Sequence, residues 1–501
     1  LQEAGNRILS DGSTLAYGRG ANPWQVEFLY QREVDYCSGV CLFTPTDLFR
    51  SIGGFDDRFA PAYYEDVDYC VRVRMAGKKV IYDPACMLYH REHGSAGAVG
   101  AARQQGANRD IFVRRHQGSE VLHAPDRPRA LFIDDRLPLN RYGSGFPRTQ
   151  KILQALESHG YAVTLYCLRQ ESLPWGEYYD ELPRSLHCEV DGAPENLGEF
   201  LRLHLNACSL VIVSRPQNLE LLQGVRDDFP QLFHQVPVIY DAEALIAPRE
   251  IAKAKLHRGV VFSEADERHV IDTELGLLKD VAYALTVSEA EAFTIETEVS
   301  IPTSIVSHEV SLLANPPTFC ERSGIVFVGP LLSIDAPNAD ALKWFLEFCL
   351  PILKRDAPEI SVRVIGECII PEFLTWSDPQ VCFLGYQPEL KTLLGKARVC
   401  IAANRFAAGI PLKVIEAAAC GTPSVVTPLL AQQLSWEDGR ELLVAERPQE
   451  FVAAIVKLYR DESCWCSLHQ AAREKVASDY SATHFLEGLQ PVFDLVQGAS
   501  A

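Results

Sequence analysis

Short apolar runs alternate along most of this chain with longer stretches whose apolar residues recur three and four positions apart. Short continuous runs are typical of strands buried in a parallel sheet, and the three-and-four spacing is typical of amphipathic helices. One series of runs opens at 130–133 and extends to about residue 307. A second series comprises the runs 325–329, 362–365, 381–384, 399–402 and 424–427. The alternation predicts an α/β protein with two parallel sheets.

The segment 312–323, which contains two prolines, separates the two series. We therefore predict two Rossmann-like domains, at 129–312 and 313–501, that face each other across a cleft. In such sheets ligands bind beyond the carboxyl ends of the strands. Terminal helices would complete the second domain.

The first 116 residues follow a different pattern. They predict a strand over 34–44, a short helix over 46–52, a helix over 65–76 and two strands over 80–82 and 87–89. These are too few elements for a complete nucleotide-binding sheet. The polar, turn-rich stretch 117–128 predicts a linker. Because the chain opens with leucine rather than methionine, we expect it to begin inside a longer polypeptide.

The strongest candidate chemistry lies in the segment from Arg405 to Thr427. Its pattern predicts a helix that begins at Pro411 and ends at Gly421, followed by a buried strand. Lys413 and Glu416 lie three apart and share one face near the positive end of this helix. A diphosphate would bind beside Lys413, while Glu416 accepts hydrogen bonds from ribose hydroxyls. The simpler interpretation is a surface ion pair of small energetic value.

Five further candidates surround the ends of predicted strands. Gly329, Gly366 and Gly385 each end an apolar run, where a ligand can approach the backbone only if a side chain is missing. Arg405 and Gly409 lie around the next strand end. A single glycine is best explained as a turn, whereas the whole set favours ligand binding.

These residues also carry a family resemblance. The donor-binding half of glycosyltransferase family 4, which has the GT-B fold, resembles the segments 327–330, 337–340, 383–385 and 405–427. The resemblance continues upstream through 132–135, 143–145 and 240–245 and covers roughly 129–491. It implies transfer of a sugar from a nucleoside diphosphate sugar to a glycan or lipid-linked acceptor in surface polysaccharide biosynthesis. It also implies retention at the anomeric carbon and no cofactor or metal.

The resemblance implies that the domain 129–312 holds the acceptor and the domain 313–501 the nucleotide-sugar donor, and it assigns roles to individual residues. Arg405 and Lys413 would neutralise the donor diphosphate, and Glu416 would hold the ribose. The backbone at Gly385 and Tyr386 would contact the nucleobase.

Two positions depart from known patterns. Members of the family often carry a glutamate where this chain has Ala408, which weakens the assignment of the sugar contact but leaves the diphosphate site. The loop with Gly143 and Gly145 lacks the third glycine of a dinucleotide fingerprint, because Arg148 occupies that place. An acceptor- or phosphate-contacting loop is therefore favoured, with a plain turn as the alternative.

Residues 1–116 resemble the acceptor-binding, C-terminal half of glycosyltransferase family 2, which has the GT-A fold. The motifs that carry this resemblance are 38–39, 55–59, 63–68, His90 and Ser95. It implies that Asp66 is the catalytic base that deprotonates the acceptor, that Glu65 orients it, and that His90 lies near a metal-bound diphosphate. A complete GT-A module would use Mg²⁺ or Mn²⁺. The simpler interpretation is that acids in a first helical turn complement the helix dipole. We expect residues 1–116 alone to transfer no sugar.

Composition excludes some partners. The formal net charge of −19 argues against nucleic acid, whose phosphates are bound by basic surfaces. The fifteen cysteines are odd in number and scattered, which favours reduced thiols and a cytoplasmic location. No apolar run reaches membrane-spanning length, and peripheral contact with the inner face of a membrane is left open.

The leading hypothesis is a bifunctional glycosyltransferase of the hexosyltransferase type. A non-catalytic nucleotide- or glycan-binding scaffold is the first alternative, favoured by Ala408 and by the incomplete family 2 half. A sugar-nucleotide epimerase is the second, since it would release its product without an acceptor. Fold alone does not decide among these activities.

Overall fold

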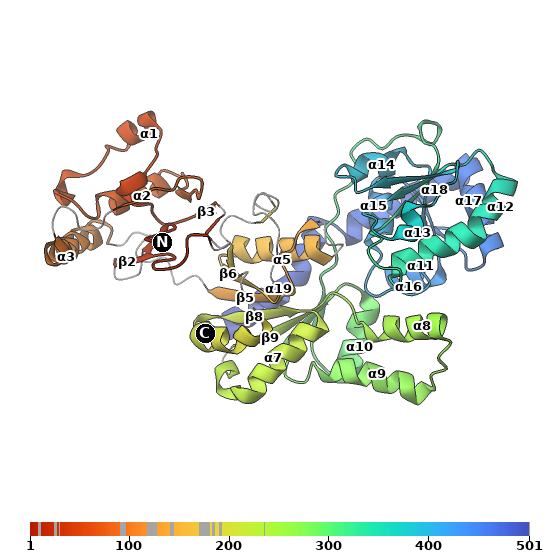
Figure 1. The fold of residues 1–501 in the computed structure, drawn as a ribbon, viewed down its shortest axis with the longest axis horizontal. Coiled ribbons are helices and arrows are strands. Elements are labelled where there is room, and N and C mark those ends of the chain that lie inside the picture. Colours follow the sequence, from red (N-terminus) through yellow and green to blue (C-terminus); the bar gives the residue numbers. More distant parts are fainter. Residues whose placement is uncertain are drawn as a thin grey trace. The chain divides into compact units, whose positions relative to one another are not determined.

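The computed structural model describes residues 1–8, 12–24, 28–29, 31–90, 97–117, 128–140, 145–169, 181–182, 186–189, 193–234 and 236–499 (Figure 1). The chain divides into two compact units. One contains Leu1–Asn140, Ile152–Val211 and Phe229–Val236, and the other contains Arg141–Lys151, Ile212–Asp228 and Pro237–Ala501.

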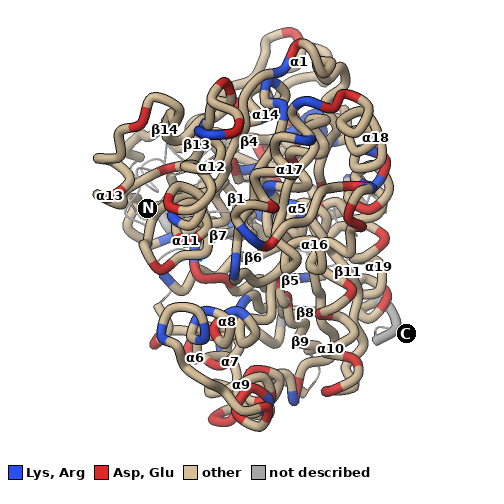
Figure 2. The backbone as a smooth tube through the Cα atoms, turned by 90° about the vertical axis from the view of Figure 1, so that its right-hand side faces the viewer, with Lys and Arg blue, Asp and Glu red and all other residues tan. Residues whose placement is uncertain are grey.

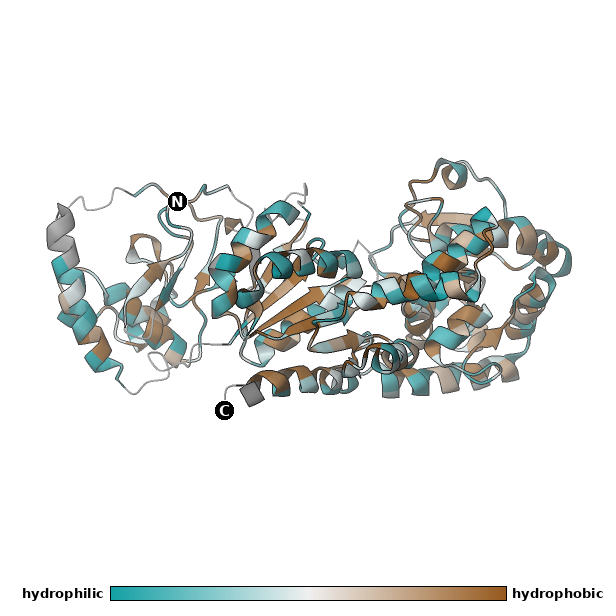
Figure 3. Ribbon diagram, turned by 90° about the horizontal axis from the view of Figure 1, so that it is seen from below, coloured by the Kyte–Doolittle hydropathy of each residue, from teal (hydrophilic) through white to brown (hydrophobic). Residues whose placement is uncertain are grey.

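Seven strands form the first large sheet, in the order β11-β10-β9-β8-β5-β6-β7. Their bounds are β5 Arg129–Asp134, β6 Ala162–Cys167, β7 His187–Glu189, β8 Leu210–Ser214, β9 Val238–Ala242, β10 Tyr283–Thr286 and β11 Thr303–Ile305. Helices that alternate with these strands are α5 Gly145–Ser158, α6 Leu197–His204, α7 Pro216–Asp228, α8 Ala247–Arg258, α9 Glu264–Gly276 and α10 Glu289–Val299. Strands β8 and β9 are buried at every position, as expected for a parallel sheet covered on both faces. In Figure 3, brown strands lie among helices that carry both brown and teal positions.

Six strands form the second large sheet, in the order β14-β13-β12-β15-β16-β17, and all its pairs are parallel. Their bounds are β12 Ile325–Val328, β13 Val362–Ile365, β14 Val381–Gly385, β15 Val399–Ala402, β16 Ser424–Val426 and β17 Leu443–Val444. The associated helices are α11 Pro337–Trp344, a π-helical turn Phe345–Cys349, α12 Leu350–Asp356, α13 Pro371–Leu374, α14 Leu390–Lys396, α15 Leu412–Ala419, α16 Pro428–Leu434, α17 Pro448–Arg460 and α18 Glu462–Asp479. The last helix, α19 Ala482–Ala499, packs instead against β11 of the seven-stranded sheet, where the hydroxyl of Ser304 donates to the carbonyl of Gly488 at 2.6 Å. The predicted α/β class with two parallel sheets is confirmed.

Gly366 lies where two strand ends approach each other too closely for a side chain. A Cβ atom added there would lie 2.1 Å from the carbonyl oxygen of Gly329, so the backbone would have to move. We expect Gly366→Ala to lower the free energy of unfolding by about 1–3 kcal/mol, measured by denaturant titration. Gly224→Ala is the matched control, because Gly224 lies inside α7 with open space around its Cα. That change should stabilise the helix slightly, and equal losses in both variants would contradict the prediction.

The N-terminal residues form smaller elements. The strands are β1 Asn6–Ile8, β2 Thr14–Ala16, β3 Arg32–Glu33 and β4 Ile81–Tyr82, and the helices are α1 Thr46–Ser51, α2 Glu65–Met75 and α3 Gly97–Arg115. The strand predicted over 34–44 is wrong. Ser38 caps a short 3₁₀ turn at Gly39–Cys41 instead, because its side chain accepts a hydrogen bond from the backbone N–H of Val40. Most of the predicted linker at 117–128 lies outside the described residues.

Charged positions of both signs occur along the chain, and α9 carries mostly acidic ones (Figure 2). Among the described residues, no helix is both long and apolar enough to cross a membrane. All cysteines whose side chains are described are free thiols.

Candidate functional site

Lys413, on α15, lies at the carboxyl ends of two central strands of the six-stranded sheet. Its Nζ donates to Oδ1 of Asn338 at 2.5 Å and to Oδ1 of Asn404 at 3.1 Å. It also lies 5.4 Å from the ring centroid of Phe327, which belongs to β12. Burial lowers the pKa of Lys413 to about 8. The two amide oxygens hold the ammonium group without neutralising its charge, so it stays available to an anion.

Arg405, in the loop after β15, is held by a carboxylate. Its Nε and Nη2 donate to the two oxygens of Asp340 at 2.9 and 2.5 Å, a bidentate arrangement. Nε2 of His257, on α8, lies 3.2 Å from the same carboxylate. Because Asp340 is buried and the Arg405 side chain is 34% exposed, the pair fixes the guanidinium while leaving part of it accessible.

Glu416 does not form the surface ion pair that is the simpler interpretation of its spacing from Lys413. Burial raises the pKa of Glu416 to about 7, and the charge that opposes this shift is that of Lys391. At neutral pH the carboxyl is therefore poised between its two forms. Hydrogen bonds donated to it by ligand hydroxyls would favour the carboxylate.

The three glycines at strand ends lie beside one another, because β12, β13 and β14 are neighbours in the sheet. A Cβ at Gly329 would lie 2.5 Å from Nδ2 of Asn338, so this glycine makes room for a protein side chain. Gly366 donates its N–H to the carbonyl of Gly385 at 2.9 Å. Gly385 has φ +66 with open space around it, and Tyr386 beside it is 59% exposed. The first two glycines thus serve packing, while the last leaves the backbone open to a ligand.

Gly409 lies in a loop that lines a pocket of about 400 Å³. It has φ +67, and an added Cβ would lie 3.0 Å from the carbonyl oxygen of Glu243. The polar residues that line the pocket are Arg215, Gln217, Glu243, Arg249 and His308, and the loop contributes Ala408–Ile410. Burial lowers the pKa of His308 to about 3, so its imidazole is neutral at physiological pH.

The glycine loop before α5 is only partly described. Gly143 lies outside the described residues, and Gly145 is the first residue of α5. A Cβ at Gly145 would lie 1.7 Å from Oε1 of Glu243, so the carboxylate of Glu243 packs on this glycine. An internal carboxylate, not an empty helix end, therefore faces Gly145.

Sequence reasoning missed the side chains that position the two cations. Asn338 and Asp340 lie in the segment 337–340 that carries the family resemblance, but the sequence predicts no role for either side chain, and it predicts none for Asn404. The signal that could have identified these three residues is that they are polar and lie close to the ends of predicted strands. Asn404 follows an apolar strand, and Asn338 and Asp340 lie in the first turn of a helix shortly after another strand end. Polar side chains at these places meet at the ligand-binding edge of a parallel sheet.

The acids at the start of α2 have separate environments. Asp66 accepts hydrogen bonds from the backbone N–H groups of Gly39 and Val67, both at 2.8 Å. Burial raises the pKa of Asp66 and of Glu65. Asp68 instead forms a structural cluster, in which Arg72 and His116 lie 2.8 and 2.9 Å from its carboxylate. These acids therefore make specific contacts in addition to complementing the helix dipole, which is the simpler interpretation of their positions.

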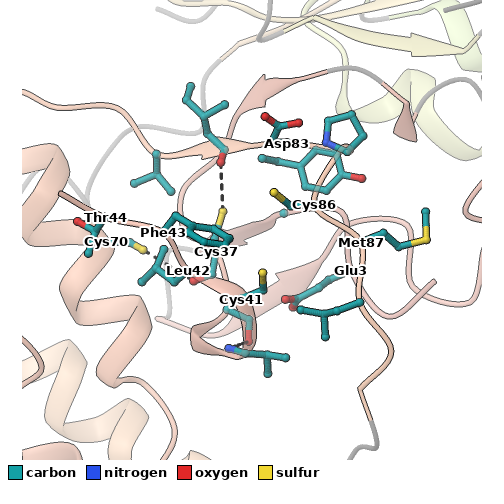
Figure 4. Close-up of a pocket in the computed structure, with 18 of the residues that line it drawn as sticks. Glu3, Cys37, Cys41, Leu42, Phe43, Thr44, Cys70, Asp83, Cys86 and Met87 are labelled. Atoms are coloured by element: carbon teal, nitrogen blue, oxygen red, sulfur yellow. Dashed lines mark hydrogen bonds between the residues drawn. The ribbon is translucent and has the colours of Figure 1, made fainter. Parts of the chain in front are cut away.

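A cavity of about 480 Å³ lies among residues 1–90 and is shown in Figure 4. Its lining is mainly apolar, with free thiols at Cys37, Cys41, Cys70 and Cys86. His90 also lines it, and Nδ1 of His90 lies 3.1 Å from Oε1 of Gln2. Within the described part of the chain, no group of three or more His, Cys, Asp or Glu side chains is arranged to hold a metal ion. The described neighbours of His90 therefore do not build a metal site, and its predicted role stays a prediction.

The six-stranded sheet lies in a segment that matches a known protein family. Residues 322–461 match the family model "Glycosyl transferases group 1". That range contains Arg405, Gly409, Lys413 and Glu416. The chain is also 30% identical over 106 residues, 19% of its length, to the N-acetylglucosaminyl-diphospho-decaprenol L-rhamnosyltransferase of Mycobacterium tuberculosis. It spans about a third of that relative, 34% of its length.

Solved structures share the fold. Sucrose-phosphate synthase from Thermosynechococcus elongatus aligns with a TM-score of 0.55 at 15% identity, over 74% of this chain and all of that one. Anabaena HepE in complex with UDP and glucose gives the same TM-score at 12% identity, again over 74% of this chain and all of that one. The chain therefore has the GT-B fold, and its residues 322–461 are similar in sequence to glycosyl transferases group 1.

Proposed function

We propose that the chain is a glycosyltransferase that uses a nucleoside diphosphate sugar as donor. The observation that carries this proposal is the ammonium group of Lys413, held by two asparagine oxygens at the carboxyl ends of parallel strands within the segment that matches the family model. A cation held by neutral groups at this edge of a sheet suits a phosphate ligand.

The neighbouring groups suit the remaining parts of such a donor. The exposed part of the Arg405 guanidinium, fixed by Asp340, would share the charge of the diphosphate with Lys413. Glu416 would accept hydrogen bonds from the ribose, and the base would lie at Gly385 and Tyr386. We further propose that these two cations replace a metal ion in this half and that transfer retains the anomeric configuration, as the family resemblance implies.

The acceptor is proposed to be a glycan or a lipid-linked glycan of a surface polysaccharide. The mycobacterial relative is an N-acetylglucosaminyl-diphospho-decaprenol L-rhamnosyltransferase, and the lipid-linked sugar in that name supports this class. Such an acceptor would place the chain in the cytoplasm, at the inner face of the membrane. In residues 1–116, Asp66 would deprotonate the acceptor, since two backbone N–H groups fix its carboxylate.

A thermal-shift panel of UDP, GDP, ADP and dTDP with their sugar derivatives tests the donor site, and UDP is the first choice because Anabaena HepE was solved with it. A ligand that binds the native state raises the unfolding midpoint by mass action. We expect one nucleotide class to raise it, and Lys413→Met to abolish that rise. Lys475→Ala is the matched control, since Lys475 pairs with Asp479 on the exposed surface of α18. No rise with any nucleotide would contradict the proposal and favour a scaffold.

A further inference from the structure

Arg215 and Glu243 form an ion pair at the pocket that the Ala408–Ile410 loop lines. Arg215 follows β8 and Glu243 follows β9, and these strands are neighbours in the seven-stranded sheet. Nη2 of Arg215 lies 3.2 Å from Oε2 of Glu243, and the two side chains are 23% and 25% exposed. The pair is therefore partly shielded from water yet reachable from the pocket.

Both residues are held in place before any ligand arrives. Arg215 has φ +78, a left-handed conformation that non-glycine residues adopt at a cost, and its guanidinium lies 4.6 Å from the ring centroid of Phe146. The N–H of Glu243 donates to the carbonyl of Asp241 at 2.9 Å, and its carboxylate packs on Gly145. Backbone strain of this kind persists where the surroundings fix a side chain in one orientation.

The polar groups of the pocket suit a sugar. Among the described residues that line it, Glu243 supplies the carboxylate, whereas Ala408 offers a methyl group. Sugar hydroxyls both donate and accept, so a carboxylate beside a guanidinium satisfies both functions. A volume of about 400 Å³ lies within the range of small-molecule sites.

We propose that Glu243 and Arg215 bind the hydroxyls of the transferred sugar, with Glu243 accepting hydrogen bonds and Arg215 donating them. This inference rests on the proposed function, because it places the sugar beside the loop that leads into α15 and Lys413. Glu243 thus provides, from the seven-stranded sheet, a carboxylate at a pocket whose other wall carries Ala408. It is a specificity-determining residue rather than part of the diphosphate site.

Glu243→Gln tests the assignment, because it removes the charge but keeps the size of the side chain. The dissociation constants of the nucleoside diphosphate found by the thermal panel and of its sugar derivative are measured by calorimetry. We expect Glu243→Gln to weaken binding of the nucleotide sugar about tenfold relative to the nucleoside diphosphate, the size of one hydrogen bond to a charged group. Binding of the nucleoside diphosphate itself should change less than about twofold. Arg215→Gln should also raise the ratio of the two dissociation constants, that of the nucleotide sugar divided by that of the nucleoside diphosphate.

Glu298→Gln is the matched control, because Glu298 also pairs with an arginine, Arg268, and neither of these residues lines the pocket. It should leave both constants unchanged. A ratio unchanged by Glu243→Gln, or an equal loss for both ligands, would overturn the sugar contact while leaving the donor site intact. Loss of folding would appear as a lower unfolding midpoint without ligand, and Arg215→Gln then decides through the same ratio. Absence of any nucleotide binding by the wild-type chain would overturn the proposed function and this inference together.

Discussion

Arg148→Met is expected to destabilise the chain by about 3–5 kcal/mol, the usual cost of removing one partner from a buried ion pair. Nη1 of Arg148 lies 2.6 Å from Oδ1 of Asp241, and both side chains are fully buried. Nε of Arg148 also donates to the carbonyl of Val306 at 2.6 Å. The change would leave the Asp241 carboxylate buried without its cation and the Val306 carbonyl without its donor. Denaturant unfolding followed by circular dichroism measures the loss.

Two further variants separate the charge from the packing. Arg148→Met combined with Asp241→Leu should recover much of the stability, because two apolar side chains leave no buried charge. Arg268→Met is the matched surface control, since Arg268 pairs with Glu298 at 55% and 35% exposure and its loss should destabilise the chain far less than the loss of Arg148. A loss below about 1 kcal/mol in Arg148→Met, or a double variant as unstable as the single one, would contradict this account.

The case of Arg148 shows where sequence reasoning stops. In the sequence it marked only the absence of a third glycine from a dinucleotide fingerprint. Its partners lie 93 and 158 positions away, in Asp241 and Val306, and no local spacing rule joins such residues. The strands themselves were predictable, because burial on both faces leaves a continuous apolar run in the sequence.

The candidate donor site likewise has some features that follow from the local sequence and others that depend on contacts between distant residues. The strand ends, the helix of Lys413 and the turn at Gly421 follow from local residue preferences, and the structure has them as β12–β16 and α15. The partners of the cations do not follow from such preferences, because Asn338 and Asp340 reach Lys413 and Arg405 only after the sheet has formed. The failed strand over 34–44 has a related cause. The N–H of Gly39 is bound by Asp66, a residue 27 positions away, and this contact favours a turn.

The affinity for a nucleoside diphosphate is expected to fall about 30-fold between pH 6.5 and pH 9.5. Burial lowers the pKa of Lys413 to about 8, so the ammonium form that attracts the diphosphate is lost as the pH rises through that value. Above the pKa of Lys413 each pH unit lowers the affinity by up to about tenfold. Isothermal titration with the nucleoside diphosphate selected by the thermal panel measures the profile.

Lys413→Arg separates this effect from other causes, because a guanidinium stays charged over the whole range. The affinity of the variant should not change with pH, and any slope that it retains belongs to the nucleotide or to other groups.

We do not expect the loss of affinity at high pH to come from unfolding of the protein around Lys413. Since the pKa of Lys413 is lower in the folded chain than its ordinary 10.5, the unfolded chain holds more protons between pH 8 and 10.5. The free energy of unfolding contributed by this group therefore rises, rather than falls, over that interval. An identical slope in wild type and Lys413→Arg would show that the ammonium of Lys413 does not contact the diphosphate.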